Sequence, residues 1–181
     1  MILYVNCCVR GDSRTDKIAR ALLSRLGGEF TELYLPGEKL QPLSAERLEK
    51  RTRLTERGDY SDEMFRYAKQ FAAADKIVIA APYWDLSFPA LLKVYIENIY
   101  VTGIVSEYAA DGTPHGLCRA EELIYVTTAG GPYVPDFSFG YLKALAGQYL
   151  GIDKTRLVKA EMLDVDGFDA DSIVKTTTDA L

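Results

Sequence analysis

The chain has 181 residues, of which 48% are hydrophobic and 26% are charged, a composition typical of one globular domain with a single core. Its formal net charge of −5 disfavours nucleic acid and anionic membranes as partners, and no apolar run approaches the roughly 20 residues that span a bilayer. The length and composition predict one domain over residues 1–181. The first residues lack the basic region of a signal peptide, so we expect a cytoplasmic protein.

Strand and helix patterns alternate through the first half of the chain. Residues 2–6 predict a strand, and Ser13 or Thr15 can cap the helix that follows, which ends at Gly27. The remaining elements of this half are a strand at 30–35, a charged surface helix at 44–57, and a helix that Ser61 caps before the apolar positions Met64, Phe65, Ala68 and Phe71.

The same alternation continues in the second half of the chain. Residues 77–81 form a short apolar run typical of a central parallel strand, and a helix follows at 91–100. The segment 102–121 is long enough to be a lid or a binding loop. The last predicted elements are a strand at 123–128, a helix at 137–150, a strand at 156–164 and a helix at 169–181.

This alternation predicts an α/β three-layer sandwich, in which helices cover both faces of a five-stranded parallel sheet. Five strands favour the flavodoxin-like order 2-1-3-4-5, where a ligand binds at the switch point between the first and third strands. The loops after the first, third and fourth strands should then lie together at one edge of the sheet.

The first of these loops, residues 6–15, leads into a helix N-terminus. Backbone N–H groups there, with the hydroxyls of Ser13 and Thr15 and the guanidinium groups of Arg10 and Arg14, favour a phosphate ligand. Helix capping alone would also explain either hydroxyl. The loop contains neither GxGxxG nor GxxxxGK[ST], so dinucleotide and Walker-type sites lack their motifs.

The other two loops favour a flat ring. The connector Pro82-Tyr83-Trp84-Asp85-Leu86 is aromatic and holds the only Trp of the chain, although rings packed on the chain's own core would also explain it. The third loop, Thr128-Ala129-Gly130-Gly131, has two glycines, which permit a close approach of the backbone. A phosphate site, an aromatic strip and a glycine turn at one sheet edge together suit FMN.

Three segments of the chain carry a family resemblance. VNCCVRGDSRT, APYWDLSFPALLKVYIENI and VTTAGG resemble the FMN-dependent NADH-azoreductases and NAD(P)H:quinone oxidoreductases of flavodoxin-like fold, and the resemblance covers essentially the whole chain. It implies a homodimer that holds FMN non-covalently. It also implies a ping-pong transfer of two electrons from NADH or NADPH to a small-molecule quinone, azo or nitroaromatic acceptor.

The resemblance further implies which residues bind FMN. The first loop would hold the phosphate, the aromatic connector would border the isoalloxazine ring, and the Gly-rich loop would contact its pyrimidine side. The residues assigned to this site are Cys8, Arg10, Ser13, Arg14, Thr15, Pro82, Tyr83, Trp84, Asp85, Leu86, Thr128, Ala129, Gly130 and Gly131. No side chain is assigned as a catalytic nucleophile or a metal ligand. The family usually has a serine near Cys8, and a hydroxyl is a better phosphate donor than a thiol.

Two other functions fit parts of the sequence. Cys8 with Arg14 and Thr15 satisfies C-x5-R-[ST], which resembles the phosphate loop of low-molecular-weight tyrosine phosphatases and arsenate reductases, where a thiolate attacks. The glycine–asparagine pattern and Asp-Pro loop of that family are absent, and a phosphatase leaves the aromatic connector unexplained. An electron-carrier flavodoxin would hold FMN but lack a substrate lid, for which residues 102–121 are a candidate.

Overall fold

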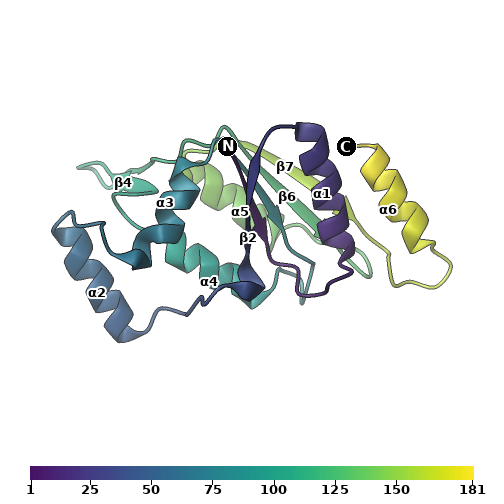
Figure 1. Ribbon diagram of the computed structural model, residues 1–181, viewed down its shortest axis with the longest axis horizontal. Coiled ribbons are helices and arrows are strands. Elements are labelled where there is room, and N and C mark those ends of the chain that lie inside the picture. Colours follow the sequence, from purple (N-terminus) through teal and green to yellow (C-terminus); the bar gives the residue numbers. More distant parts are fainter.

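The computed structural model describes residues 1–181 and contains a five-stranded parallel sheet in the order β2-β1-β3-β6-β7 (Figure 1). Counted along this sheet, the order is the predicted 2-1-3-4-5 of a flavodoxin-like fold. Because β1 pairs with both β2 and β3, the switch point lies beside β1. The strands are β1 (Ile2–Asn6), β2 (Phe30–Tyr34), β3 (Lys76–Ala80), β6 (Glu122–Thr128) and β7 (Lys154–Ala160).

Helices cover both faces of the sheet (Figure 1). One face carries α1 (Arg14–Leu26) and α6 (Ala170–Asp179), whereas the other carries α3 (Arg66–Ala73), α4 (Ala90–Ile99) and α5 (Phe139–Leu145). The charged helix α2 (Ala45–Glu56) has no buried residue and lies at the periphery, as expected for a surface helix. None of these helices combines the length and apolar character that a membrane span needs.

The alternation of side chains along β1 explains why the protein has a core on each face of the sheet. Ile2 and Tyr4 pack with the apolar side chains of α1, whereas Leu3 and Val5 pack with those of α3 and α4. All four side chains are buried, because the central strands have helices on both sides. The continuous apolar run of β1 is therefore the signature of this buried position.

The helix predicted after Ser61 begins later than expected. Asp62 caps a 3₁₀ turn at Glu63–Phe65 by accepting a hydrogen bond of 3.0 Å from the Met64 N–H, and α3 follows that turn. The Ser61 hydroxyl instead donates to Asp59 Oδ1 at 2.6 Å. Ser61 is thus engaged in a local turn and does not cap the helix, which corrects that prediction.

Two further boundaries differ from the predictions. The helix expected over 137–150 starts at Phe139, and its last turn, η3 (Ala146–Leu150), is π-helical. The strand expected over 156–164 is β7, which ends at Ala160, because the chain turns at Met162 with φ of +66°. The residues beyond β7 then hydrogen-bond to the Gly-rich loop, with Leu163 N–H 3.2 Å from Ala129 O.

The long segment 102–121 contains an antiparallel hairpin, β4 (Ser106–Tyr108) and β5 (Pro114–Gly116). Gly116 lies so close to the end of η3 that an added Cβ would be 1.9 Å from the backbone nitrogen of Gly151. Only glycine permits this approach. The hairpin is therefore anchored on the end of the η3 helix.

Candidate functional site

A cavity lies where the carboxyl ends of β1, β3, β6 and β7 meet. The three loops that the sequence places at one sheet edge all contribute to it, and the loop after β7 is a fourth contributor. The cavity is lined by Cys8, Val9, Arg10, Asp12, Ser13, Arg14, Thr15, Pro82, Tyr83, Trp84, Thr128, Ala129, Gly130, Leu163 and Asp164. Of the predicted site residues, Asp85, Leu86 and Gly131 do not line it, and neither does any residue of the segment 102–121.

Direct hydrogen bonds join the three predicted loops. The hydroxyl oxygens of Thr15 and Thr128 are 2.7 Å apart, which connects the first turn of α1 to the Gly-rich loop. The Tyr83 N–H donates to Thr128 O at 3.0 Å, which connects the aromatic connector to the same loop. The convergence expected from the strand order is therefore held by specific contacts at the cavity wall.

The first loop offers hydrogen-bond donors to an anion. Ser13 caps α1 by accepting from the Asp16 N–H at 3.3 Å. The backbone N–H groups of Arg14 and Thr15 belong to the first helical turn and therefore have no acceptor within the helix. The helix dipole favours negative charge at this end, and the exposed Arg10 forms no ion pair. This set of donors suits a phosphate group.

Arg14 has a second role that the sequence did not indicate. Its Nη1 atom lies 2.9 Å from Asp164 Oδ1 and donates to Leu163 O at 3.2 Å. The guanidinium therefore connects the first loop to the loop after β7. An anion bound in the cavity would share Arg14 with the carboxylate of Asp164.

Four lining residues were absent from the predicted site, namely Val9, Asp12, Leu163 and Asp164. The first two lie between predicted residues of the first loop. The last two fall at the end of the strand predicted over 156–164, so the prediction places no loop before Asp164. Ligands in open α/β sheets bind beyond the carboxyl ends of strands, and this rule would have found the fourth loop if the strand had been ended at Ala160.

The aromatic connector forms a tight turn from Trp84 to Ser87, closed by two backbone hydrogen bonds of 3.0 and 2.8 Å. Asp85 and Leu86 at its tip have φ values of +50° and +67°. This left-handed conformation costs a non-glycine residue roughly 1–2 kcal/mol. Trp84 and Leu86 are nevertheless 43% and 55% exposed. Strain and exposed apolar side chains beside a cavity are typical of a binding surface.

Tyr83 is packed more firmly than its neighbours in the connector. Its ring lies edge-on to the ring of Tyr133 with 4.8 Å between centroids, and its hydroxyl accepts a hydrogen bond of 3.3 Å from the Val134 N–H. The alternative that connector rings pack on the chain itself thus holds for Tyr83. It does not hold for Trp84, whose side chain is exposed.

The two glycines of the third loop occupy different environments. A Cβ added to Gly130 would lie 2.5 Å from Asp164 Oδ2, closer than real Cβ contacts, whereas one added to Gly131 would meet nothing within 4 Å. The absence of a side chain at Gly130 therefore lets the fourth loop approach the Gly-rich loop. The N–H groups of both glycines form no hydrogen bond within the chain, so they remain available as donors.

The Cys8 thiol is inside the protein although it lines the cavity. The residue is 3% exposed, and its Sγ lies 3.8 Å from Ala80 O. Burial raises the pKa of the Cys8 thiol to about 11, even though a hydrogen bond with Ser13 acts in the opposite direction. A thiolate nucleophile needs a lowered pKa. The environment of Cys8 therefore does not fit the phosphatase mechanism.

Comparison with known proteins places the chain in a family. Residues 1–180 match the family model described as Flavodoxin-like fold. The chain is 36% identical to FMN-dependent NADH:quinone oxidoreductase 2 of Clostridium acetobutylicum, over 97% of this chain and 93% of that protein. It is 33% identical to FMN-dependent NADH:quinone oxidoreductase of Lachnoclostridium phytofermentans, over 96% of this chain and 92% of that protein.

Solved structures share the same fold at lower sequence identity. The azoreductase of Bacillus anthracis strain Sterne superposes with a TM-score of 0.83 at 23% identity, covering 99% of this chain and 95% of that chain. An FMN-dependent NADH-azoreductase of Bacillus anthracis strain Ames Ancestor, solved in complex with FMN, has a TM-score of 0.81 at 20% identity, with 99% and 94% covered. The chain therefore belongs to the flavodoxin-like family that contains the FMN-dependent NADH:quinone oxidoreductases.

Proposed function

We propose that this chain is an FMN-dependent oxidoreductase that transfers two electrons from NADH to small-molecule quinones, and also to azo or nitroaromatic compounds. The observation that carries the proposal is the convergence of a first loop rich in hydrogen-bond donors, an exposed aromatic turn and a close-packed glycine loop at one cavity. The names of the curated relatives support both the cofactor and the reaction. On this proposal residues 1–181 form one FMN-binding domain.

The donors and apolar side chains that line the cavity support its assignment to FMN. The N–H groups of the first turn of α1, the hydroxyls of Ser13 and Thr15, and the guanidinium groups of Arg10 and Arg14 would hold the phosphate, with Cys8 at the base of the loop. The Trp84 side chain with Pro82 and Tyr83 would border the ring, and Asp85 and Leu86 at the tip of the turn would reach its outer edge.

The Gly-rich loop would meet the polar edge of the ring. Thr128 and Ala129 line the cavity, and the N–H groups of Gly130 and Gly131 have no acceptor within the chain. The Ala129 N–H is not available, because it donates to Ala160 O at 2.9 Å. Held by these residues, FMN would supply the redox chemistry, which is two-electron transfer from NADH to the acceptor. The protein's part is to bind, orient and shield it.

We also propose that the active form is a homodimer in which a second copy covers exposed apolar side chains beside the cavity. Trp84, Leu86, Val134 and Phe137 are each at least 38% exposed. They belong to two adjoining loops, because the Ser87 hydroxyl donates to Phe137 O at 2.8 Å. Light scattering on the purified protein tests this proposal. A monomer at assay concentrations that reduces quinones at full rate would contradict it.

The decisive experiment is a flavin titration of the purified protein followed by an activity assay. We expect a yellow protein, or a colourless one that quenches the fluorescence of added FMN and then oxidises NADH only when a quinone is present. Parallel assays with NADPH and with an azo dye establish the donor preference and the acceptor range. A protein that remains colourless and binds no added FMN would refute the proposed function.

A further inference from the structure

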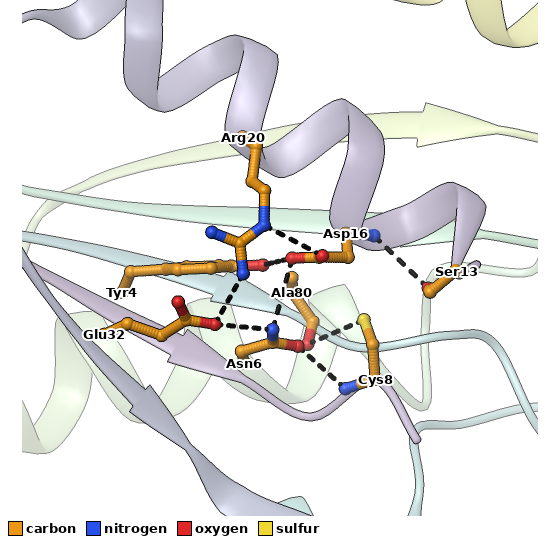
Figure 2. A network of polar contacts seen from close by, with 8 residues as sticks. All are labelled: Tyr4, Asn6, Cys8, Ser13, Asp16, Arg20, Glu32 and Ala80. Carbon is orange, nitrogen blue, oxygen red and sulfur yellow. Dashed lines mark hydrogen bonds and ion pairs between the residues drawn. The ribbon is translucent and has the colours of Figure 1, made fainter. Parts of the chain in front are cut away.

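A network of polar side chains joins β1, α1 and β2 next to the first loop (Figure 2). The carboxylate of Asp16 accepts three hydrogen bonds, from the Tyr4 hydroxyl at 2.5 Å, from Asn6 Nδ2 at 3.2 Å and from Arg20 Nε at 2.9 Å. Arg20 also donates to Glu32 Oε1 at 2.7 Å. These side chains do not line the cavity, so their effect on a ligand must pass through the loop.

Asn6 is the residue at which the network meets the first loop. It is the last residue of β1 and is 3% exposed. Its Nδ2 donates to Glu32 Oε1 at 2.8 Å as well as to Asp16, whereas its Oδ1 accepts from the Cys8 N–H at 3.0 Å. The carboxylates can only accept and the Cys8 N–H can only donate, so the partners determine the orientation of the amide.

Through these bonds a single side chain holds both ends of the first loop. Cys8 lies near the start of the loop, and Asp16 lies in the first turn of α1, where its own N–H is capped by Ser13. The residues between them carry the donors that face the cavity. Donors held in place before the ligand arrives reduce the entropy lost on binding and so raise affinity.

We infer that Asn6 is a positioning residue that pre-organises the first loop for the phosphate of the flavin without touching it. This inference rests on the proposed function. The amide is specifically suited to the role. Leucine, which is similar in size, would leave the buried Cys8 N–H without an acceptor, and aspartate would place a third carboxylate beside Asp16 and Glu32.

The test compares two flavins that differ only in the phosphate. Wild-type protein and the Asn6→Leu variant are titrated with FMN and with riboflavin, and flavin fluorescence reports binding. We expect FMN affinity to fall roughly tenfold, as for one unsatisfied buried donor, while riboflavin affinity stays unchanged. An equal loss for both flavins, or no loss for either, would overturn the inference.

A second variant adds a pH signature that a purely structural role would not produce. In Asn6→Asp, the new carboxyl is pushed toward its protonated form by neighbouring negative charge, and once protonated it can again donate and accept. We expect the ratio of FMN to riboflavin affinity to recover toward the wild-type ratio as the pH falls. A ratio that follows the wild type at every pH contradicts the inference. The charged and titratable groups around this position are Asp16, Arg20, Glu32, Tyr4 and Cys8.

Asn98 provides a matched control. It is 5% exposed, and its Nδ2 donates to Gln41 O and Val94 O on the other side of the sheet from α1. Asn98→Leu should lower stability but leave the ratio of the two affinities unchanged. If Asn6→Leu does not fold, Asp16→Asn tests the same connection and should show the same selective loss. A wild-type protein that binds neither flavin would refute the proposed function instead.

Discussion

Cys8 is the residue at which the oxidoreductase and the phosphatase would differ most. Its buried thiol has a pKa raised to about 11 and is therefore protonated at neutral pH. We expect Cys8→Ser to retain quinone reduction and to bind FMN at least as tightly, because a hydroxyl is the stronger donor. The measurement is NADH oxidation with a quinone, alongside hydrolysis of an aryl phosphate. Loss of reductase activity, or phosphatase activity in the wild type that the variant lacks, would contradict this expectation.

Gly130 and Gly131 form a natural matched pair. A methyl group at Gly130 must displace the carboxylate of Asp164, and with it the ion pair to Arg14, whereas Gly131 has open space. Because Asp164 is a flexible, exposed side chain, the methyl group mainly breaks the exposed ion pair, and we expect Gly130→Ala to weaken FMN binding by up to about fivefold, in line with ~0.2–1 kcal/mol for such a pair. Gly131→Ala should behave like the wild type. Flavin titrations of both variants measure the difference. Equal affinities would show that close approach at Gly130 does not shape the site.

Among the loop elements, the turn from Trp84 to Ser87 combines strain with exposure. Leu86 has φ of +67° and is 55% exposed, so glycine there should raise the free energy of unfolding by about 1 kcal/mol. Loss of the apolar side chain should at the same time raise KM for the quinone. Urea unfolding and steady-state kinetics measure the two effects. Phe168→Gly is the control, since Phe168 is 52% exposed without a positive φ and its substitution should not stabilise the protein.

The order of the elements could be predicted because apolar runs and caps are local features of the sequence. The end of β7 could not, since Val158, Ala160 and Leu163 are all buried although the strand stops at Ala160. A pattern of apolar residues indicates which residues are buried. Here residues remain buried beyond the last hydrogen bond that pairs β7 with β6, so the pattern does not show where the strand ends. That error concealed the fourth loop of the cavity and the partner of Arg14.

Other parts of the site depended on tertiary contacts that no local pattern carries. Asn6 sits at the end of an apolar run, and its three partners come from α1, β2 and the first loop. The segment 102–121, a candidate lid by its length alone, is anchored on η3 through Gly116. Length indicated that the segment was unusual but could not indicate which surface it covers.

For the whole molecule, the edge of the sheet opposite the cavity carries a concentrated set of ion pairs. Glu122 begins β6 and is 4% exposed, with Lys76 Nζ at 2.5 Å, Lys154 Nζ at 3.4 Å and Arg156 Nε at 3.7 Å. Burial acts to raise the pKa of Glu122, but hydrogen bonds and charge attraction from Lys76 and Lys154 outweigh it and leave the pKa lowered. The folded state therefore favours the ionised carboxylate.

Because the pKa of Glu122 is lower in the folded state than in the unfolded state, its ion pairs stabilise the fold at neutral pH, and this stabilisation is lost on acidification. We expect Glu122→Gln to reduce the free energy of unfolding by about 1–3 kcal/mol at neutral pH. The difference in free energy of unfolding between variant and wild type should narrow as the pH falls below the usual glutamate pKa of 4.5 and then through the lower pKa that Glu122 has in the folded state. Urea unfolding across this range measures it, with the exposed neighbour Glu121 changed to Gln as control. A gap independent of pH would contradict the linkage.

The ion pair between Arg14 and Asp164 joins residues 150 positions apart in the chain. We expect a contact of such long sequence separation to form late in folding, because closing the long loop between its residues costs entropy. The cavity is therefore complete only after β7 has joined the sheet. A ligand that needs the complete cavity stabilises the finished native state by mass action and gives little help to partly folded forms. The rate of flavin binding during refolding would then report the last step of folding, in which β7 joins the sheet and completes the cavity.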